Sequence, residues 1–236
     1  IALDAIRNAI KPNDFHFAST RLLALENTFN GLALPDAYLQ AATQLARSHG
    51  LATHVDGARL MNAASASGRD AAWIAAQFDS VSMCFSKGLG APVGSVLVGP
   101  KDFIETARRI RKMLGGGMRQ TGVLAAAAIY ALEHNVTRLG EDHRRAASLA
   151  KVLARFPDLA AGPSRTNMVF MTPKGIDTSA FAAFLRSRGI AVSGRYGTLR
   201  WVTHLDVDDA SVERVAEACD IFFNRQKAPA EMKAHA

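Results

Sequence analysis

The sequence predicts an α/β protein in two parts, a partial large α/β domain followed by a smaller α+β C-terminal domain. Two observations lead to this prediction. Apolar strands alternate with helices as far as about residue 156, and several of these strands run directly into polar residues. Such alternation is typical of a parallel sheet covered by helices. Short strands and helices follow Pro163 in an α+β order, so we expect domains at 1–135 and 136–236.

Local signals define the elements of the large domain. Pro35 precedes a helix that Gly50 ends, because proline is favoured at helix starts and glycine just beyond helix ends. Apolar residues spaced by three and four predict a later helix that carries Phe103, Ala107, Ile110 and Leu114. We expect helices at 1–10, 35–49 and from 121 through 128, an alanine-rich segment at 70–77, and strands at 21–25, 52–55, 80–85 and 94–98.

The smaller domain is expected to begin with a long helix over 136–156, which ends before Pro157. Strands are expected at 168–171, 190–193 and 199–202, and helices at 178–187 and 210–224. The tail from Lys227 is rich in alanine, lysine and proline, so we expect it to fray.

Composition excludes several classes of function. The chain is 49% hydrophobic and 21% charged, a globular composition, and its uncharged stretches fall short of the roughly 20 residues of a membrane helix. Lysine and arginine exceed the acids by 28 − 21 = 7, but these cations are scattered and accompany no nucleic-acid motif. Cys84 and Cys219 lie far apart, which fits a reducing cytoplasm. We therefore expect a cytoplasmic protein that binds no nucleic acid, membrane or metal.

Two polar residues at strand ends carry the chemical argument. Lys87 follows an apolar strand, and Asp56 ends the strand before it. A partly buried lysine keeps some of its amine uncharged, as Schiff-base chemistry requires. Pyridoxal 5′-phosphate (PLP) needs such a lysine and a carboxylate at its ring nitrogen. An exposed loop lysine and a helix-capping aspartate are the alternatives, but the two residues together favour the cofactor.

Five segments then resemble one family. They read KPNDFHFASTRLLALENTFNG at 11–31, HVDGARLMNA at 54–63, SVSMCFSKGLGAPVGSVLVG at 80–99, RKMLGGGMRQTG at 111–122 and LRWVTHLDV at 199–207. In this order they are similar to the low-specificity L-threonine aldolases, PLP-dependent enzymes of the aspartate-aminotransferase fold (fold type I). The resemblance implies that fold, PLP as cofactor, and cleavage of β-hydroxy-α-amino acids such as L-threonine or L-allo-threonine to glycine and acetaldehyde.

The resemblance also implies roles for the matching residues. Lys87 would bind the cofactor covalently, with Ser86 beside it, and Asp56 would pair with the ring nitrogen. Arg59 would hydrogen-bond the phenolic oxygen of the ring. Arg200 would bind the substrate carboxylate, for which a planar guanidinium is well suited.

Further matches concern assembly and proton transfer. Lys112 and Arg119 would reach the cofactor phosphate of a neighbouring subunit, which implies a homodimer or homotetramer. His16 would lie near the substrate hydroxyl, although an ordered water or the cofactor phosphate could equally be the base. His54 is expected to point to the opposite face of its strand from Asp56 and to be structural.

The sequence departs from the family in two places. Phe29 stands where family members usually carry histidine, and the family's first hundred or so residues have no counterpart, so we expect a piece of a longer chain with an uncovered apolar sheet surface. Two alternative functions remain open. One is another fold-type-I PLP lyase, either β-eliminating or acting on phenylserine, and the other is a non-catalytic remnant that serves as an interaction module.

Overall fold

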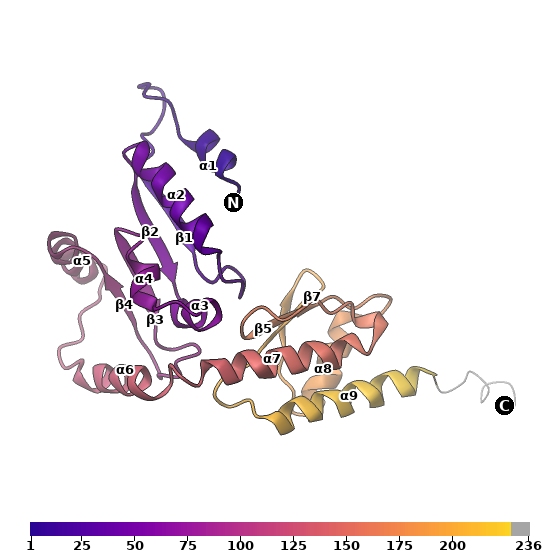
Figure 1. The fold of residues 1–236 in the computed structure, drawn as a ribbon. Helices are drawn as coiled ribbons and strands as arrows, with labels where there is room; N and C mark the ends of the chain where they lie inside the picture. The colour runs from indigo at the N-terminus through magenta and orange to yellow at the C-terminus, as the bar shows by residue number, and fades with distance from the viewer. Residues whose placement is uncertain (228–236) are drawn as a thin grey trace, which may run out of the picture. The chain divides into compact units, whose positions relative to one another are not determined.

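The computed structural model describes residues 1–227 (Figure 1). This described chain divides into two compact units after Gly140, and each unit is treated by itself. The domain boundary expected after residue 135 stays a prediction, because a division of this chain into compact units does not define the domains of the whole protein. Residues 228–236, which hold most of the tail expected to fray, lie outside the described residues.

The described part of the first unit contains a four-stranded sheet in the order β1-β2-β3-β4. The first three strands are parallel, and β4 pairs antiparallel with β3 at the edge. Their bounds are Leu22–Glu26 for β1, Ala52–Gly57 for β2, Ser80–Cys84 for β3 and Ser95–Val98 for β4. The four strands expected in this region are therefore confirmed.

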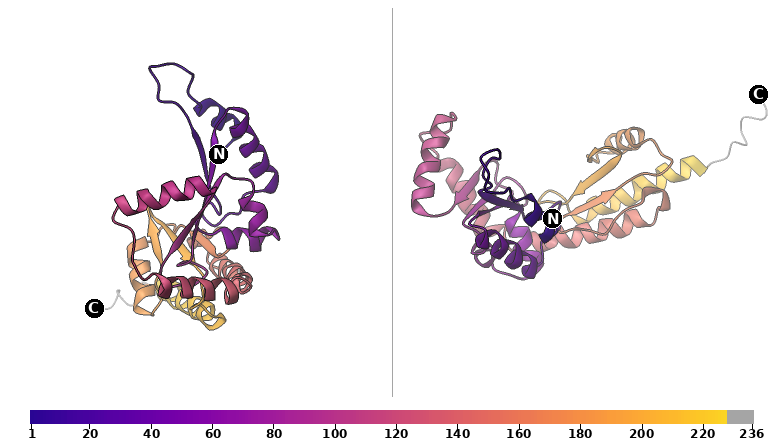
Figure 2. Two further views of the ribbon diagram at one scale, coloured as in Figure 1. Left: turned by 90° about the vertical axis from the view of Figure 1, so that its left-hand side faces the viewer. Right: turned by 90° about the horizontal axis from the view of Figure 1, so that it is seen from above.

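Helices cover one face of this sheet. α2 (Asp36–Ser48) connects β1 to β2 and lies along them in Figures 1 and 2. α1 (Leu3–Ala9), α3 (Leu60–Ser67) and α4 (Ala71–Ala75) complete the layer. The core consists of apolar side chains from odd-numbered strand positions and from these helices: Ile6, Leu23, Leu25, Leu39, Ala42, Ala46, Leu51, Val55, Leu60, Ala63, Ile74, Phe78 and Val81. Odd positions are buried because side chains alternate between the two faces of a strand.

The opposite face of the sheet has a different character from the one expected. It carries Leu22 and Leu97, which are 52% and 37% exposed. Between these edge residues the even positions are small or polar: Ala24, Glu26, Ala52, His54, Asp56, Ser80 and Ser82. The expectation of an apolar uncovered surface is therefore wrong for the centre of this sheet. The strands can carry polar residues there because the hydrophobic core lies entirely on the other face.

The last two helices of the unit are α5 (Lys101–Met113) and α6 (Gly122–His134), which confirms both expected helices. The apolar stripe of α5 points away from the described core. Phe103, Ile110 and Leu114 are 41%, 49% and 83% exposed. Helical periodicity in the sequence thus identified an apolar surface that the described residues leave largely exposed.

The second unit is built on a three-stranded antiparallel sheet within the described residues, in the order β5-β7-β6. Its strands are β5 (Met168–Met171), β6 (Ser193–Arg195) and β7 (Thr198–Val202), and its helices are α7 (Leu139–Ala154), the 3-10 turn η1 (Pro157–Leu159), α8 (Thr178–Ser187) and α9 (Asp209–Lys227). Leu199 and Trp201 of β7 pack in one cluster with apolar residues of the helices. Most expected elements are confirmed.

The strand expected at 190–193 is wrong. β6 begins only at Ser193, and Ile190 and Val192 pack against the core without strand pairing. Their apolar character reflects this packing, which a short apolar run cannot distinguish from a strand.

The described residues show the state of the cysteines, the spacing of metal-ligating side chains, and the length and polarity of the helices. Cys84 and Cys219 are free thiols, and burial raises the pKa of the Cys219 thiol to about 12. Among residues 1–227, no three histidine, cysteine or acidic side chains gather as a metal site would require. The helices within that range are all too short or too polar to cross a membrane.

Gly57, the last residue of β2, yields a test of this packing. A Cβ there would lie 2.9 Å from the Ser82 carbonyl oxygen and 3.1 Å from the Leu60 Cβ. We expect Gly57→Ala to lower the free energy of unfolding by about 1–3 kcal/mol, measured by urea denaturation, because strand or helix must shift. Gly122→Ala is the control, since a Cβ there meets no atom within 4 Å. Equal stabilities of the two variants would contradict the close approach of β2 and β3.

Candidate active site

The parallel pairing of β2 with β3 creates the candidate site. Asp56 lies directly beside Ser82 in the register, so both strands end at the same edge of the sheet. The Asn27 backbone N–H donates a hydrogen bond of 3.0 Å to the Asp56 carbonyl, which joins the end of β1 to this edge. Open α/β sheets bind ligands at the carboxyl ends of their strands. The residues that follow β2 and β3 are therefore positioned to meet a ligand.

Asp56 presents its carboxylate on the uncovered face of the sheet. One carboxylate oxygen, Oδ1, accepts a hydrogen bond of 2.9 Å from the Ala58 backbone N–H. Asp56 is not the N-cap of α3, because that position belongs to Arg59. The alternative of a helix-capping aspartate is therefore wrong for α3. The hydrogen bond fixes the orientation of an exposed carboxylate.

Lys87 lies in a tight loop between β3 and β4. The loop closes on itself, because Gly90 N–H donates to the Lys87 carbonyl at 2.9 Å and Ala91 N–H to the Phe85 carbonyl at 3.0 Å. Gly88 is closely approached by side chains, since a Cβ there would lie 3.0 Å from the Leu139 Cδ2 and 3.1 Å from the Asn62 Oδ1. These contacts hold the backbone on both sides of the lysine.

The α6 end anchors this loop from behind. Asn135 donates its side-chain N–H to the Leu89 carbonyl at 2.8 Å. Leu89, Ala91, Ala131 and Leu139 form a small buried cluster beneath the loop. The Lys87 side chain itself is exposed, and no ion pair involves it among residues 1–227. The expected partial burial of Lys87 is therefore wrong for this chain, because its loop neighbours pack inward while the lysine faces outward.

Arg59 and Ser86 lie close to the same edge. Arg59 lines a cavity of about 10 Å³ together with Cys84 and Gly88, which places it against the start of the Lys87 loop. The Ser86 Oγ lies 3.2 Å from the Cys84 Sγ. The structure thus brings Asp56, Arg59, Ser86 and Lys87 to one edge of one sheet.

His16 lies in the loop before β1, away from secondary structure. Its Nδ1 is 2.7 Å from the Asp14 Oδ1, and its ring contacts the Phe15 ring at a centroid distance of 3.9 Å. Backbone and side-chain hydrogen bonds from His16 lower the pKa of the Asp14 carboxyl. Both side chains are exposed. Among the described contacts, His16 interacts with Asp14 and Phe15 but with none of the other residues expected in the site.

The remaining expected residues belong to other elements than the strands and loops that form this edge. Lys112, in the last turn of α5, and Arg119, in the connection to α6, are exposed on either side of Gly115–Gly117. Arg200 is exposed on β7 in the second unit, where it pairs with Phe170 and Ser193. The position of each of these residues is therefore described only within its own unit.

Two residues near the edge escaped the sequence reasoning. His54 shares the uncovered face with Asp56, because Thr53 and Val55 are the buried positions of β2. The prediction that His54 points to the opposite face is wrong, and strand alternation alone could have corrected it. The His54 Nδ1 lies 2.8 Å from the Ser80 Oγ. Asn135 anchors the Lys87 loop, but no local signal in the sequence connects the two.

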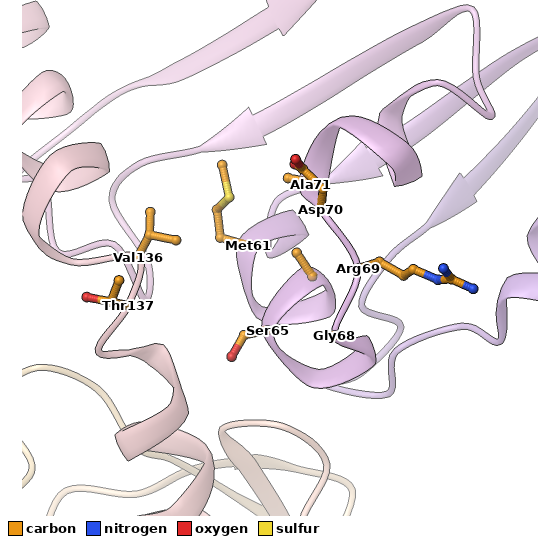
Figure 3. A pocket seen from close by; sticks show the side chains of 9 residues that line it. Met61, Ser65, Gly68, Arg69, Asp70, Ala71, Val136 and Thr137 are labelled. Atoms are coloured by element: carbon orange, nitrogen blue, oxygen red, sulfur yellow. The ribbon is translucent and has the colours of Figure 1, made fainter.

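A separate cavity of about 480 Å³ lies next to α3 (Figure 3). Met61 and Ser65 of α3 line it opposite Val136 and Thr137. Arg69 also lines it, but its guanidinium forms an ion pair of 2.6 Å with Asp36. None of the expected site residues lines this cavity, so its volume does not identify the chemical site.

Sequence comparison places the chain among known proteins. The family model described as beta-eliminating lyase matches residues 1–175. The low specificity L-threonine aldolase of Escherichia coli strain K12 is 46% identical over 227 residues, which cover 95% of this chain and 67% of that protein.

Solved structures support the same fold. A putative aromatic amino acid beta-eliminating lyase/threonine aldolase from Exiguobacterium is 26% identical and has a TM-score of 0.72. The match covers 84% of this chain and 62% of that one. A Leishmania major threonine aldolase is 22% identical with a TM-score of 0.78, covering 94% of this chain and 67% of that one. The chain therefore spans about two thirds of the length of these proteins.

The anchoring of the Lys87 loop by Asn135 can be tested directly. Asn135→Ala removes the donor to the Leu89 carbonyl, so we expect the free energy of unfolding to fall by about 1–2 kcal/mol. Hydrogen exchange of the backbone amides at 87–90 should accelerate more than exchange elsewhere. Asn8→Ala, at an exposed position of α1, should change neither quantity. Unchanged exchange at 87–90 in Asn135→Ala would contradict the anchoring.

Proposed function

This chain belongs to the low-specificity L-threonine aldolases within the beta-eliminating lyase family, and we propose that the protein cleaves β-hydroxy-α-amino acids to glycine and an aldehyde. L-threonine and L-allo-threonine, which yield acetaldehyde, are the proposed substrates. The observation that carries the proposal is the shared edge of the parallel strands β2 and β3, where Asp56 lies at the end of β2 and Lys87 follows β3.

The residues at this edge fit PLP as the cofactor. A primary amine at Lys87 suits an aldehyde, a carboxylate at Asp56 suits a protonated pyridine nitrogen, and a guanidinium at Arg59 suits a phenolic oxygen. The Asp56 carboxylate is held by only one described hydrogen bond, from Ala58, and no described partner neutralises Lys87. Both groups are therefore available to such a ligand.

Bound PLP supplies an electron sink for the pair of electrons left at the substrate Cα when the Cα–Cβ bond breaks. Asp56 holds the proton on the ring nitrogen, and this positive charge makes the sink effective. The hydrogen bond from Ala58 N–H to Oδ1 would orient the carboxylate. Lys87 would hold the cofactor at the strand edge through its side-chain amine.

Other residues of the chain bind the substrate and move its proton. Arg200 binds the substrate carboxylate through parallel N–H groups of its guanidinium. His16 accepts the β-hydroxyl proton at Nε2, because Asp14 engages Nδ1 at 2.7 Å and thereby selects the tautomer with a free Nε2. Loss of that proton lets the hydroxyl oxygen form the aldehyde as the Cα–Cβ bond breaks, and a proton then returned to Cα yields glycine.

A second candidate function is β-elimination, which the name of the matching family favours. Product analysis distinguishes the two activities. The protein, supplied with PLP and L-threonine, should release glycine and acetaldehyde in equal amounts. Ammonia and a keto acid as the main products would identify a β-eliminating lyase instead.

A protein that binds no PLP would support the alternative of a non-catalytic interaction module.

Lys87→Ala tests the assignment of the lysine. We expect it to abolish turnover and to remove the visible absorbance of the lysine-linked cofactor, because the other described lysines do not follow a parallel strand beside Asp56. Lys151→Ala, on α7, is the matched control and should retain both properties. Retention of full activity and absorbance by Lys87→Ala would remove this lysine from the mechanism.

The proposed active unit is a cytoplasmic homo-oligomer, either a dimer or a tetramer. Lys112 and Arg119 are exposed next to Gly115–Gly117, outside the strands and loops that form the candidate site. Exposed cations bind a phosphate weakly in water and much more strongly where water is excluded. A two-fold interface provides such an environment and would let these residues serve the site of the partner subunit.

Mixed oligomers test whether Arg119 acts across the interface. Lys87→Ala and Arg119→Ala chains should each be inactive or impaired alone. Co-expression should restore part of the activity, because mixed dimers combine Lys87 of one chain with Arg119 of the other. Arg186→Ala, on α8, serves as the surface control and should leave PLP retention unchanged. Mixed dimers that form without regaining activity would show that Arg119 acts within its own subunit.

A further inference from the structure

Glu26 is a second carboxylate directly beside Asp56. It is the last residue of β1, and the parallel register pairs it with Asp56 of β2. Neighbouring strands of a sheet lie about 4.8 Å apart, and laterally paired residues of parallel strands share a face. Leu25 and Val55 are buried on the opposite face, so the Glu26 and Asp56 side chains both lie on the uncovered one.

The backbone keeps this pair together. Beyond Glu26, the Asn27 N–H continues the ladder with a 3.0 Å hydrogen bond to the Asp56 carbonyl. The Asn27 side chain is buried, and its Oδ1 accepts a hydrogen bond of 3.1 Å from the Leu34 N–H. The end of β1 is thus tied to β2 and to the following turn, so Glu26 cannot move away from Asp56 without breaking these hydrogen bonds.

Two like charges in lateral register repel each other. Among residues 1–227 no hydrogen bond or ion pair engages the Glu26 carboxylate. The repulsion is relieved when a cation binds at the face that both side chains share. The cation that the proposed function brings to Asp56 is the protonated ring nitrogen of PLP.

We propose that Glu26 is a positioning residue that acts with Asp56 to favour the protonated ring nitrogen of the cofactor. This inference rests on the proposed function. Asp56 would contact the nitrogen directly, whereas Glu26, on the neighbouring strand about 4.8 Å away, would contribute its negative charge without direct contact. Removing that charge weakens the binding of a cationic ring and leaves the binding of a ring without a basic nitrogen unchanged.

The test compares the affinities of two ligands. PLP and 1-deazapyridoxal 5′-phosphate, in which CH replaces the ring nitrogen, are titrated against the purified protein by absorbance and calorimetry. Glu26→Gln keeps the size of the side chain but removes its charge, and should bind PLP roughly tenfold more weakly while binding the deaza analogue as the unchanged protein does. Glu26→Asp keeps the charge and should retain most of the PLP affinity. Circular dichroism verifies that each variant is folded.

Two further variants calibrate the result. Asp56→Asn should show the same selective loss of PLP affinity to a larger extent, because its contact with the ring is direct. Glu133→Gln removes an exposed charge on α6 and should change neither affinity.

The outcomes separate this inference from the proposed function. Glu26→Gln that binds PLP like Glu133→Gln, or that loses affinity for both ligands equally, overturns the role of Glu26 alone. Failure of the unchanged protein to bind PLP overturns the proposed function and this inference with it.

Discussion

The parallel pairing of β2 with β3 is the interaction on which the candidate site depends. It places Asp56 beside Ser82 and makes both strands end at one edge, where the Lys87 loop begins. A shift of the register by one residue would turn Asp56 into the hydrophobic core and Val55 out of it. The buried Val55 and Val81, packed under α2, α3 and α4, therefore fix which carboxylate faces the ligand.

The backbone of the Lys87 loop is held by buried contacts, whereas the side chains expected to react make few contacts. Leu89 and Leu139 are buried beneath the Lys87 loop, and Asn135 is bonded to the Leu89 carbonyl. In contrast, Lys87 and Asp56 themselves are exposed. This arrangement is typical of binding sites, in which a rigid scaffold presents polar groups that remain free to interact with a ligand. The loop backbone is positioned before any ligand arrives.

Polar side chains of neighbouring strands lie side by side on the uncovered face of the sheet. Glu26 and Asp56 form one lateral pair, and His54 and Ser80 form the pair below them. Charges and hydrogen bonds on such a face gain strength when water is excluded from it. The apolar stripe of α5 and the cations around Gly115–Gly117 belong to the same unit and are exposed.

The sequence by itself determined the α/β class, almost all of the helices and strands, and the family, because periodicity, capping residues and five linked motifs are local properties of the chain. It also predicted Asp56 and Lys87 as site residues, since polar residues at the ends of apolar strands are visible in the letters. Only the tertiary structure decided which groups are neighbours. The register joined Glu26 to Asp56, and the distant Asn135 was bonded to the Lys87 loop. It also showed that Ile190 and Val192 pack without strand pairing and that Lys87 is exposed. Burial and lateral contacts depend on residues far apart in the chain, so no local pattern could have predicted them.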